Sequence, residues 1–158
     1  MKDDISSILK GWGEPAYRIK QVEDARRTGI RSWEDVTTLP KDLREKLSEV
    51  VPLWTVTPDA VAESTDGTLK WRLRTHDGLA IESVLIKHAR GRRTLCVSSQ
   101  AGCALGCKFC ATGTMGPGRD LTSREISDQA YLANDVAREA DARVSNVVFM
   151  GMGEPLQN

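Results

Sequence analysis

The run Cys-Ala-Leu-Gly-Cys-Lys-Phe-Cys at residues 103–110 constrains the fold and chemistry of this chain more than any other feature. Its C-x3-C-x2-C spacing puts Cys103, Cys107 and Cys110 on one short loop, within reach of a single small inorganic centre. A cubic iron–sulfur cluster needs four ligands, one for each iron, and Cys thiolates usually supply them. Three thiolates leave one iron open, and an open iron is a place for chemistry.

A zinc site is the main alternative for this loop. Structural zinc takes four ligands, usually through a second pair of closely spaced Cys or His residues. The only histidines, His76 and His88, lie upstream without that spacing, so Cys96 is the available fourth ligand. The residues alone favour a cluster and leave zinc open.

Composition and charge narrow the class of protein. Lys+Arg and Asp+Glu both total 22 in the 158 residues, so no overall basic field indicates a nucleic-acid partner. The densest basic run, residues 87–93, is by default a solvated turn, and it becomes a candidate phosphate contact only beside a site that acts on RNA. With no membrane-spanning run and no signal-peptide pattern, we expect a cytoplasmic protein in which clustered cysteines serve metal or redox chemistry.

The pattern of residues predicts three segments. Residues 1–50 form a helical accessory domain, with one helix from near Pro15 to Gly29 and another from near Pro40. Residues 51–92 form a β-rich connector, in which strands at 69–74 and 80–86 alternate in part and Asp-Gly turns precede them.

Residues 93–158 are predicted to form the opening of an α/β domain. An apolar run at 94–99 leads into the cysteine loop, and the capping-box form of Thr122–Glu125 begins a helix. Its predicted apolar stripe consists of Ile126, Ala130, Ala133 and Ala137. The run 146–150 predicts a strand of the kind buried in a parallel sheet. Because one βαβ unit cannot close a barrel, we expect the chain to be the N-terminal fragment of a longer α/β protein.

The residues around the loop carry a family resemblance. The C-x3-C-x2-C motif with Phe109 before its last Cys resembles radical S-adenosylmethionine (SAM) enzymes. The flanking sequences, residues 95–103, 109–113 and 121–129 and the Val-Phe-Met-Gly-Met-Gly-Glu-Pro-Leu run at 148–156, are similar to the RNA adenine carbon-2 methyltransferases, the RlmN-like family. The match is tight over residues 80–158. It is looser over the first 50 residues, where acidic and basic residues replace the family's bulky aromatics after Gln21.

The resemblance implies a fold, cofactors and site residues. The fold would be the N-terminal part of a partial (β/α) radical SAM barrel, beginning at residue 93. Cys103, Cys107 and Cys110 would hold a [4Fe-4S] cluster whose open iron binds SAM, and Gly153 and Glu154 would contact SAM. As implied catalytic residues, Glu82 would be a general base or a partner of the adenine amino group. Cys96 would resolve a protein–RNA crosslink by forming a disulfide with a methyl-carrying cysteine that this chain lacks.

The implied function is methylation of carbon 2 of an adenosine in 23S rRNA and in tRNA through a methyl-cysteine intermediate. Radical chemistry suits this target because carbon 2 of adenine is electron-poor. The implied partners are these RNAs and an electron donor protein, with no membrane partner, for a monomeric enzyme whose fragment would be inactive alone. Two alternatives stay open: a Cfr-like carbon-8 methyltransferase, and a non-catalytic zinc- or cluster-binding RNA module.

Overall fold

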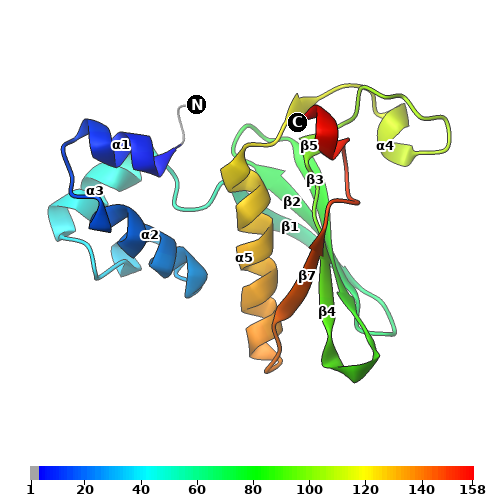
Figure 1. The fold of residues 1–158 in the computed structure, drawn as a ribbon, viewed down its shortest axis with the longest axis horizontal. Coiled ribbons are helices and arrows are strands. Elements are labelled where there is room, and N and C mark those ends of the chain that lie inside the picture. The colour runs from blue at the N-terminus through cyan, green and yellow to red at the C-terminus, as the bar shows by residue number, and fades with distance from the viewer. Residues whose placement is uncertain (1–3) are drawn as a thin grey trace. The chain divides into compact units, whose positions relative to one another are not determined.

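The structure is a computed structural model that describes residues 4–158 of the chain. The chain forms two compact units, Met1–Trp54 and Thr55–Asn158, each with its own hydrophobic core (Figure 1). No helix within the described range is long and apolar enough to cross a membrane.

The first unit is helical. It contains α1 (Ile5–Gly11), α2 (Tyr17–Arg27), the 3-10 turn η1 (Trp33–Asp35) and α3 (Lys41–Val50). The two helices expected in this segment are present. Helix α2 begins at Tyr17, two residues after Pro15, and Pro40 is the N-cap of α3. Amphipathic spacing explains α3, because Leu43 and Leu47 are both buried in the core of this unit.

A five-stranded sheet organises the second unit. Its strands are β1 (Val56–Glu63), β2 (Leu69–Thr75), β3 (Ala80–Lys87), β4 (Arg93–Cys96) and β7 (Val144–Val148), in the order β1-β2-β3-β4-β7. The first four strands pair antiparallel, and β4 pairs parallel with β7. The expected meander and the expected parallel pair are both present. Strand β1 was not predicted, since it is an exposed edge strand with Pro58 and no alternation to reveal it.

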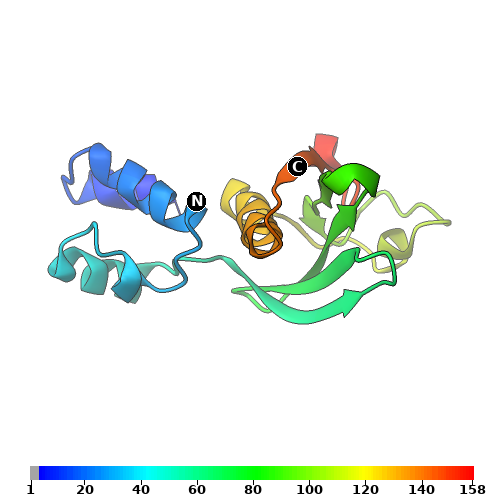
Figure 2. The ribbon, with the colours of Figure 1, turned by 90° about the horizontal axis from the view of Figure 1, so that it is seen from below.

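Helix α5 (Ser123–Glu139) connects β4 to β7 and lies along one side of the sheet (Figure 1), and Figure 2 shows it nearly end-on beside the strands. The predicted capping box is present, with Thr122 and Glu125 each satisfying the other's backbone N–H. The predicted stripe is rotated from the observed buried face. Ala133 and Ala137 are buried, whereas Ile126 and Ala130 are only partly buried. The buried face also holds three polar residues, Glu125, Asp128 and Gln129. The helical spacing of apolar residues does not predict polar residues on a buried face.

The expectation that the strand at 146–150 is fully buried is wrong for the described residues. Strand β7 is at the sheet edge and pairs only with β4, so Val147 is 46% exposed. Met150, two residues after the strand ends, is 80% exposed. A strand needs a neighbour or a covering layer on each side to be buried, and β7 has a strand on one side only.

Short elements complete this unit. The two-residue strands β5 (Gln100–Ala101) and β6 (Arg119–Asp120) pair antiparallel as a second sheet. Between them lie the cysteine loop and the single-turn helix α4 (Ala111–Thr114). The 3-10 turn η2 (Ala89–Gly91) lies between β3 and β4. The 3-10 turn η3 (Pro155–Gln157) lies near the end of the described chain, after β7.

Candidate cofactor site

The cysteine loop, residues 102–118, leaves the sheet after β4 and is closed at its base by the β5–β6 pair. The Cys103 N–H donates to the Gly116 carbonyl at 3.0 Å across the two arms. A Cβ on Gly102 would lie 2.7 Å from the Gly116 oxygen, and one on Gly118 would overlap the Ala101 carbonyl. Glycine at both positions therefore lets the two arms approach closely enough to close the loop.

All four cysteines are free thiols of intermediate burial. Cys110 is the N-cap of α4, and the N–H groups of Gly113 and Thr112 hold the pKa of its thiol below its usual value. Cys107 lies beside the same turn, because a Cβ on Gly113 would be 2.8 Å from the Cys107 backbone nitrogen. A lowered pKa favours the thiolate, which is the form that binds metal.

The glycine-rich segment, residues 151–154, follows β7 and packs directly on the chain that leads from β4 into the cysteine loop. The Met152 carbonyl accepts the N–H groups of Ser99 and Gln100 at 2.9 and 3.2 Å. Gly153 has φ +97°, and a Cβ there would lie 2.5 Å from the Gln100 Cβ. A glycine is therefore required here both by its backbone conformation and by the close approach of Gln100.

Gln100 connects the two predicted cofactor-binding segments. Its side-chain oxygen accepts the Glu154 N–H at 2.9 Å, and its amide nitrogen donates to the Asp120 carboxylate at 2.8 Å. The Glu154 carboxylate accepts the Leu156 N–H at 3.1 Å with one of its two oxygens. The structure thus brings Gly153 and Glu154 next to the base of the cysteine loop.

Glu82 and Cys96 lie on one face of the sheet. Cys96 on β4 pairs with Val84 on β3, and Glu82 is two residues from Val84, so both side chains point away from the face that carries the α5 core. The Ser98 hydroxyl donates to the Glu82 carbonyl at 2.6 Å, which places Glu82 at the end of the sheet where the cysteine loop begins.

The side-chain environments of these two residues differ. The Glu82 carboxylate is 47% exposed and pairs with the Lys70 ammonium at 2.6 Å. Burial raises the pKa of the Cys96 thiol even though it accepts the Met150 N–H. Cys96 is therefore mainly protonated at neutral pH in this state, and Cys110 is the more ionised of the two thiols.

The basic run at 87–93 does not join these residues. It forms the turn between β3 and β4, and Figure 1 shows that turn at the opposite end of β4 from the cysteine loop. If this basic turn binds RNA phosphates, it does so at a distance from the cysteine loop.

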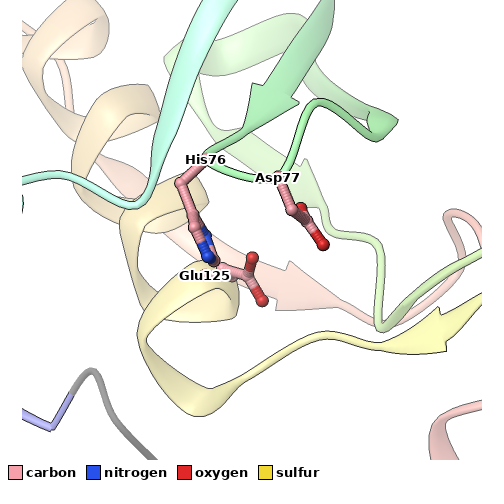
Figure 3. A group of neighbouring side chains, drawn as sticks. All are labelled: His76, Asp77 and Glu125. Carbon is pink, nitrogen blue, oxygen red and sulfur yellow. The ribbon is translucent and has the colours of Figure 1, made fainter.

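Sequence reasoning missed a set of long-range polar contacts that hold this end of the unit together. Gln129 on α5 accepts the Ser98 N–H at 2.9 Å and donates to the Ser98 carbonyl at 3.0 Å. Figure 3 shows Asp77 from the β2–β3 turn and Glu125 from α5 close to one another, and Arg119 on β6 bonds both carboxylates. The sequence does show polar residues in the first two turns of α5, Glu125, Asp128 and Gln129, which could have indicated such contacts. It does not show which residues they contact.

The three thiols of the cysteine loop fit the ligand set of an iron–sulfur cluster. Among residues 4–158, the one group with three ligand atoms within 4.8 Å of one another is His76, Asp77 and Glu125. In that group both carboxylates are already paired with Arg119. A cluster presents separate irons to separate thiolates, which suits three partly exposed thiols on a glycine-closed loop.

Comparisons with known proteins agree with this geometry. No protein-family model matches the chain. The chain is 47% identical, over 99% of its length, to the probable dual-specificity RNA methyltransferase RlmN of Dictyoglomus thermophilum, and 44% identical to that of Anaeromyxobacter dehalogenans, again over 99%. It spans 44% of the length of each of these relatives. The crystal structure of a radical SAM methyltransferase from Sphaerobacter thermophilus matches 98% of the chain and 46% of its own, with a TM-score of 0.89 and 44% identity.

The sheet, α5 and the cysteine loop thus define the class: the chain has the α/β fold of a radical SAM methyltransferase over the part that it spans. More narrowly, the chain is similar along 99% of its length to RNA methyltransferases of the RlmN-like family. The expected fold class and family are both confirmed.

Proposed function

We propose that this chain is the cluster- and SAM-binding part of an RNA methyltransferase that modifies carbon 2 of an adenosine in 23S rRNA and in tRNA. The observation that carries the proposal is the placement of three free thiols on a closed loop beside a glycine-rich segment, with Gln100 bonded to both segments. The names of relatives that are 42–47% identical support RNA as the substrate class.

Each predicted residue has a role that its surroundings permit. Cys103, Cys107 and Cys110 would hold a [4Fe-4S] cluster, and backbone N–H groups of Gly113 and Thr112 lower the pKa of the Cys110 thiol. Such a cluster, when bound with SAM on its open iron, would supply the electron that cleaves the sulfonium. Gly153 lets its segment pack against Gln100, beside the base of the cysteine loop. The second carboxylate oxygen of Glu154 can accept hydrogen bonds from the SAM ammonium or ribose.

Glu82 and Cys96 would act on the RNA side of the reaction. Their shared face of the sheet is opposite α5, so a base held against that face would meet both side chains. Glu82 would accept or hold a proton, and Lys70 keeps its carboxylate in place. Cys96 would resolve the crosslink by attacking the sulfur of a methyl-carrying cysteine: a disulfide forms, the bond from that sulfur to the RNA-linked carbon breaks, and that carbon takes up a proton. The methyl-carrying cysteine is not among the four cysteines of this chain. An electron donor protein would complete the system.

A chimera tests this proposal. This chain replaces the matching segment of the Dictyoglomus thermophilum relative, and the chimera is expressed in a bacterial strain without its own adenine carbon-2 methyltransferase. Mass spectrometry of 23S rRNA and tRNA nucleosides should show 2-methyladenosine, and Cys103→Ala in the chimera should remove it. Formation of 8-methyladenosine would support the Cfr-like alternative, and absence of both products in a folded chimera would contradict methyltransferase function.

A further inference from the structure

The cysteine loop is held to the rest of its unit through its two ends. Among the described residues, the hydrogen bonds of residues 103–117 all join loop residues to one another, as between Cys103 and Gly116 and between Cys110 and Cys107. None of these bonds reaches the five-stranded sheet or α5. The position of the three thiols therefore depends on the two stalks of the loop, β5 and β6.

Arg119 on β6 fixes one of these stalks to two other elements. Its guanidinium donates to both oxygens of Asp77, in the β2–β3 turn, at 2.7 and 2.8 Å. It also donates to both oxygens of Glu125, in the first turn of α5, at 2.9 and 2.7 Å. Asp77 and Glu125 come from different elements and point into the same space, as Figure 3 shows. One side chain thus makes two bidentate pairs.

The paired carboxylates of Asp77 and Glu125 require an Arg side chain at position 119. The Glu125 side chain is 1% exposed, and burial of a carboxylate is costly without a cationic partner. Burial would raise the pKa of Glu125, yet hydrogen bonds from Arg119 and Thr122 lower it overall. Hydrogen bonds from Arg119 also hold the pKa of Asp77 well below its usual value. The planar fork of Arg can serve two carboxylates at once, which a Lys ammonium cannot do with the same geometry.

The same residue is adjacent to the first predicted cluster ligand. Arg119 pairs with Ala101 in the β5–β6 ladder, two residues before Cys103. Arg119 and Cys103 line one small cavity of about 40 Å³ at the base of the loop. A shift of Arg119 would therefore reach Cys103 through the β5–β6 pair, because Ala101 is two residues before Cys103.

We propose that Arg119 is a positioning residue for the cluster: by bonding Asp77 and Glu125 together it sets where the three thiols lie relative to the sheet and the glycine-rich segment. The inference deepens the proposed function and rests on it for the identity of the bound group. It assigns to Arg119 no contact with substrate or cofactor.

Two variants separate positioning from charge balance. Arg119→Lys keeps a cation near Glu125 but loses the two bidentate pairs with Asp77 and Glu125. In Arg119→Gln/Glu125→Gln no buried charge is left unpaired at these two positions, and the amide introduced on α5 retains an oxygen that can accept the Thr122 N–H. The matched control is Arg138→Lys, which changes another Arg–carboxylate pair, with Asp135, at the far end of α5.

The first measurement is backbone amide hydrogen exchange in the 158-residue chain without cluster. In both Arg119 variants the Cys103 amide should exchange at least about tenfold faster, while amides in the middle of α5 keep their wild-type rates. The control should leave both regions unchanged. Unchanged exchange at Cys103 overturns the proposal, and so does equal acceleration of the loop and α5, which would make Arg119 a general stabilising residue.

The second measurement is the electron paramagnetic resonance spectrum of the reduced, reconstituted chain. Arg119→Lys should retain wild-type iron content but show a changed line shape, and Arg138→Lys should match the wild type. A wild-type spectrum for Arg119→Lys overturns the proposal. If the wild type binds no cluster, the proposed function fails, and the exchange experiment still decides whether Arg119 positions the loop.

Discussion

At the scale of single residues, the four cysteines divide into two environments. Cys110 is at the N-cap position of a short helix, where the backbone N–H groups of Gly113 and Thr112 lower the pKa of its thiol. Cys96 is in a strand, where burial raises the pKa of its thiol. Both effects follow from solvation and hydrogen bonding, and they fit the separate roles that we propose for these residues, cluster ligand and resolving thiol.

These environments predict the order of thiol alkylation. In the chain without cluster, iodoacetamide should modify Cys110 before Cys96, and the rate at Cys110 should reach half its maximum at a lower pH, because only the thiolate reacts. Mass spectrometry of peptides after timed quenching measures both rates. A Cys110→Ser variant is the control that assigns the fast phase, and faster reaction at Cys96 would contradict the assigned environments.

Gly153 is the second residue-scale feature that the structure makes testable. Gly153→Ala adds a Cβ at φ +97° that meets Gln100, whereas Gly78→Ala adds one at φ +83° with open space around it. Backbone strain should cost Gly78→Ala about 1–2 kcal/mol, and overpacking should cost Gly153→Ala a further 1–3 kcal/mol or so. Urea denaturation measures both free energies of unfolding. Equal losses would show that Gln100 does not restrict position 153.

At the scale of elements, α5 holds polar residues in a helix face that also packs against the core. Asp128 is fully buried and accepts both the backbone N–H and the hydroxyl of Thr55 at 2.7 Å. Together with Glu125 and Gln129, it ties the helix to three separate segments of the unit. Hydrogen bonds specify one orientation of the helix, which apolar packing specifies less sharply.

Loss of the Asp128 contacts should destabilise the unit. Asp128→Ala leaves two buried donors on Thr55 without an acceptor, so the free energy of unfolding should fall by about 2–4 kcal/mol in chemical denaturation. Ser127→Ala, on the exposed side of the same helix, should change it by about 0.5 kcal/mol or less. A loss for Asp128→Ala no larger than that of the control would mean that these bonds contribute little.

At the scale of the whole molecule, local signals in the sequence predicted most of the fold. The capping box, the Asp-Gly turn at 77–78 and the C-x3-C-x2-C loop depend on neighbours within a few residues, and each is present where expected. Strand β1 was missed because an exposed edge strand needs no apolar alternation. The expected burial of β7 was wrong because burial depends on what covers a strand, which its own residues do not encode.

For the candidate site, the sequence likewise indicated individual residues but not the contacts between them. The family resemblance indicated the site residues, and the structure places two of them, Glu82 and Cys96, on one face. The bonds that connect the parts, through Gln100, Arg119 and Gln129, join residues that are 6 to 54 positions apart. Such partners are chosen by the tertiary fold, so the sequence showed the polar residues but not their pairing.

The Arg119 network also predicts how the whole unit responds to acid. The pKa values of Asp77 and Glu125 are lowered in the folded state, so their stabilising contribution is complete above the ordinary carboxyl pKa of about 4 and is lost as the pH falls through the lower folded-state values. The melting temperature of the wild type should therefore fall more steeply below about pH 4 than that of Arg119→Gln/Glu125→Gln. Parallel curves from differential scanning calorimetry would contradict this assignment.

The most direct test of the central claim is the iron and sulfide content of the anaerobically reconstituted chain. We expect about four irons and four sulfides per chain, near-complete loss of both in Cys103→Ala, Cys107→Ala and Cys110→Ala, and wild-type content in Cys96→Ala. A colourless protein that carries stoichiometric zinc without iron or sulfide would contradict the claim. Loss of the cluster in Cys96→Ala would contradict the role assigned to Cys96.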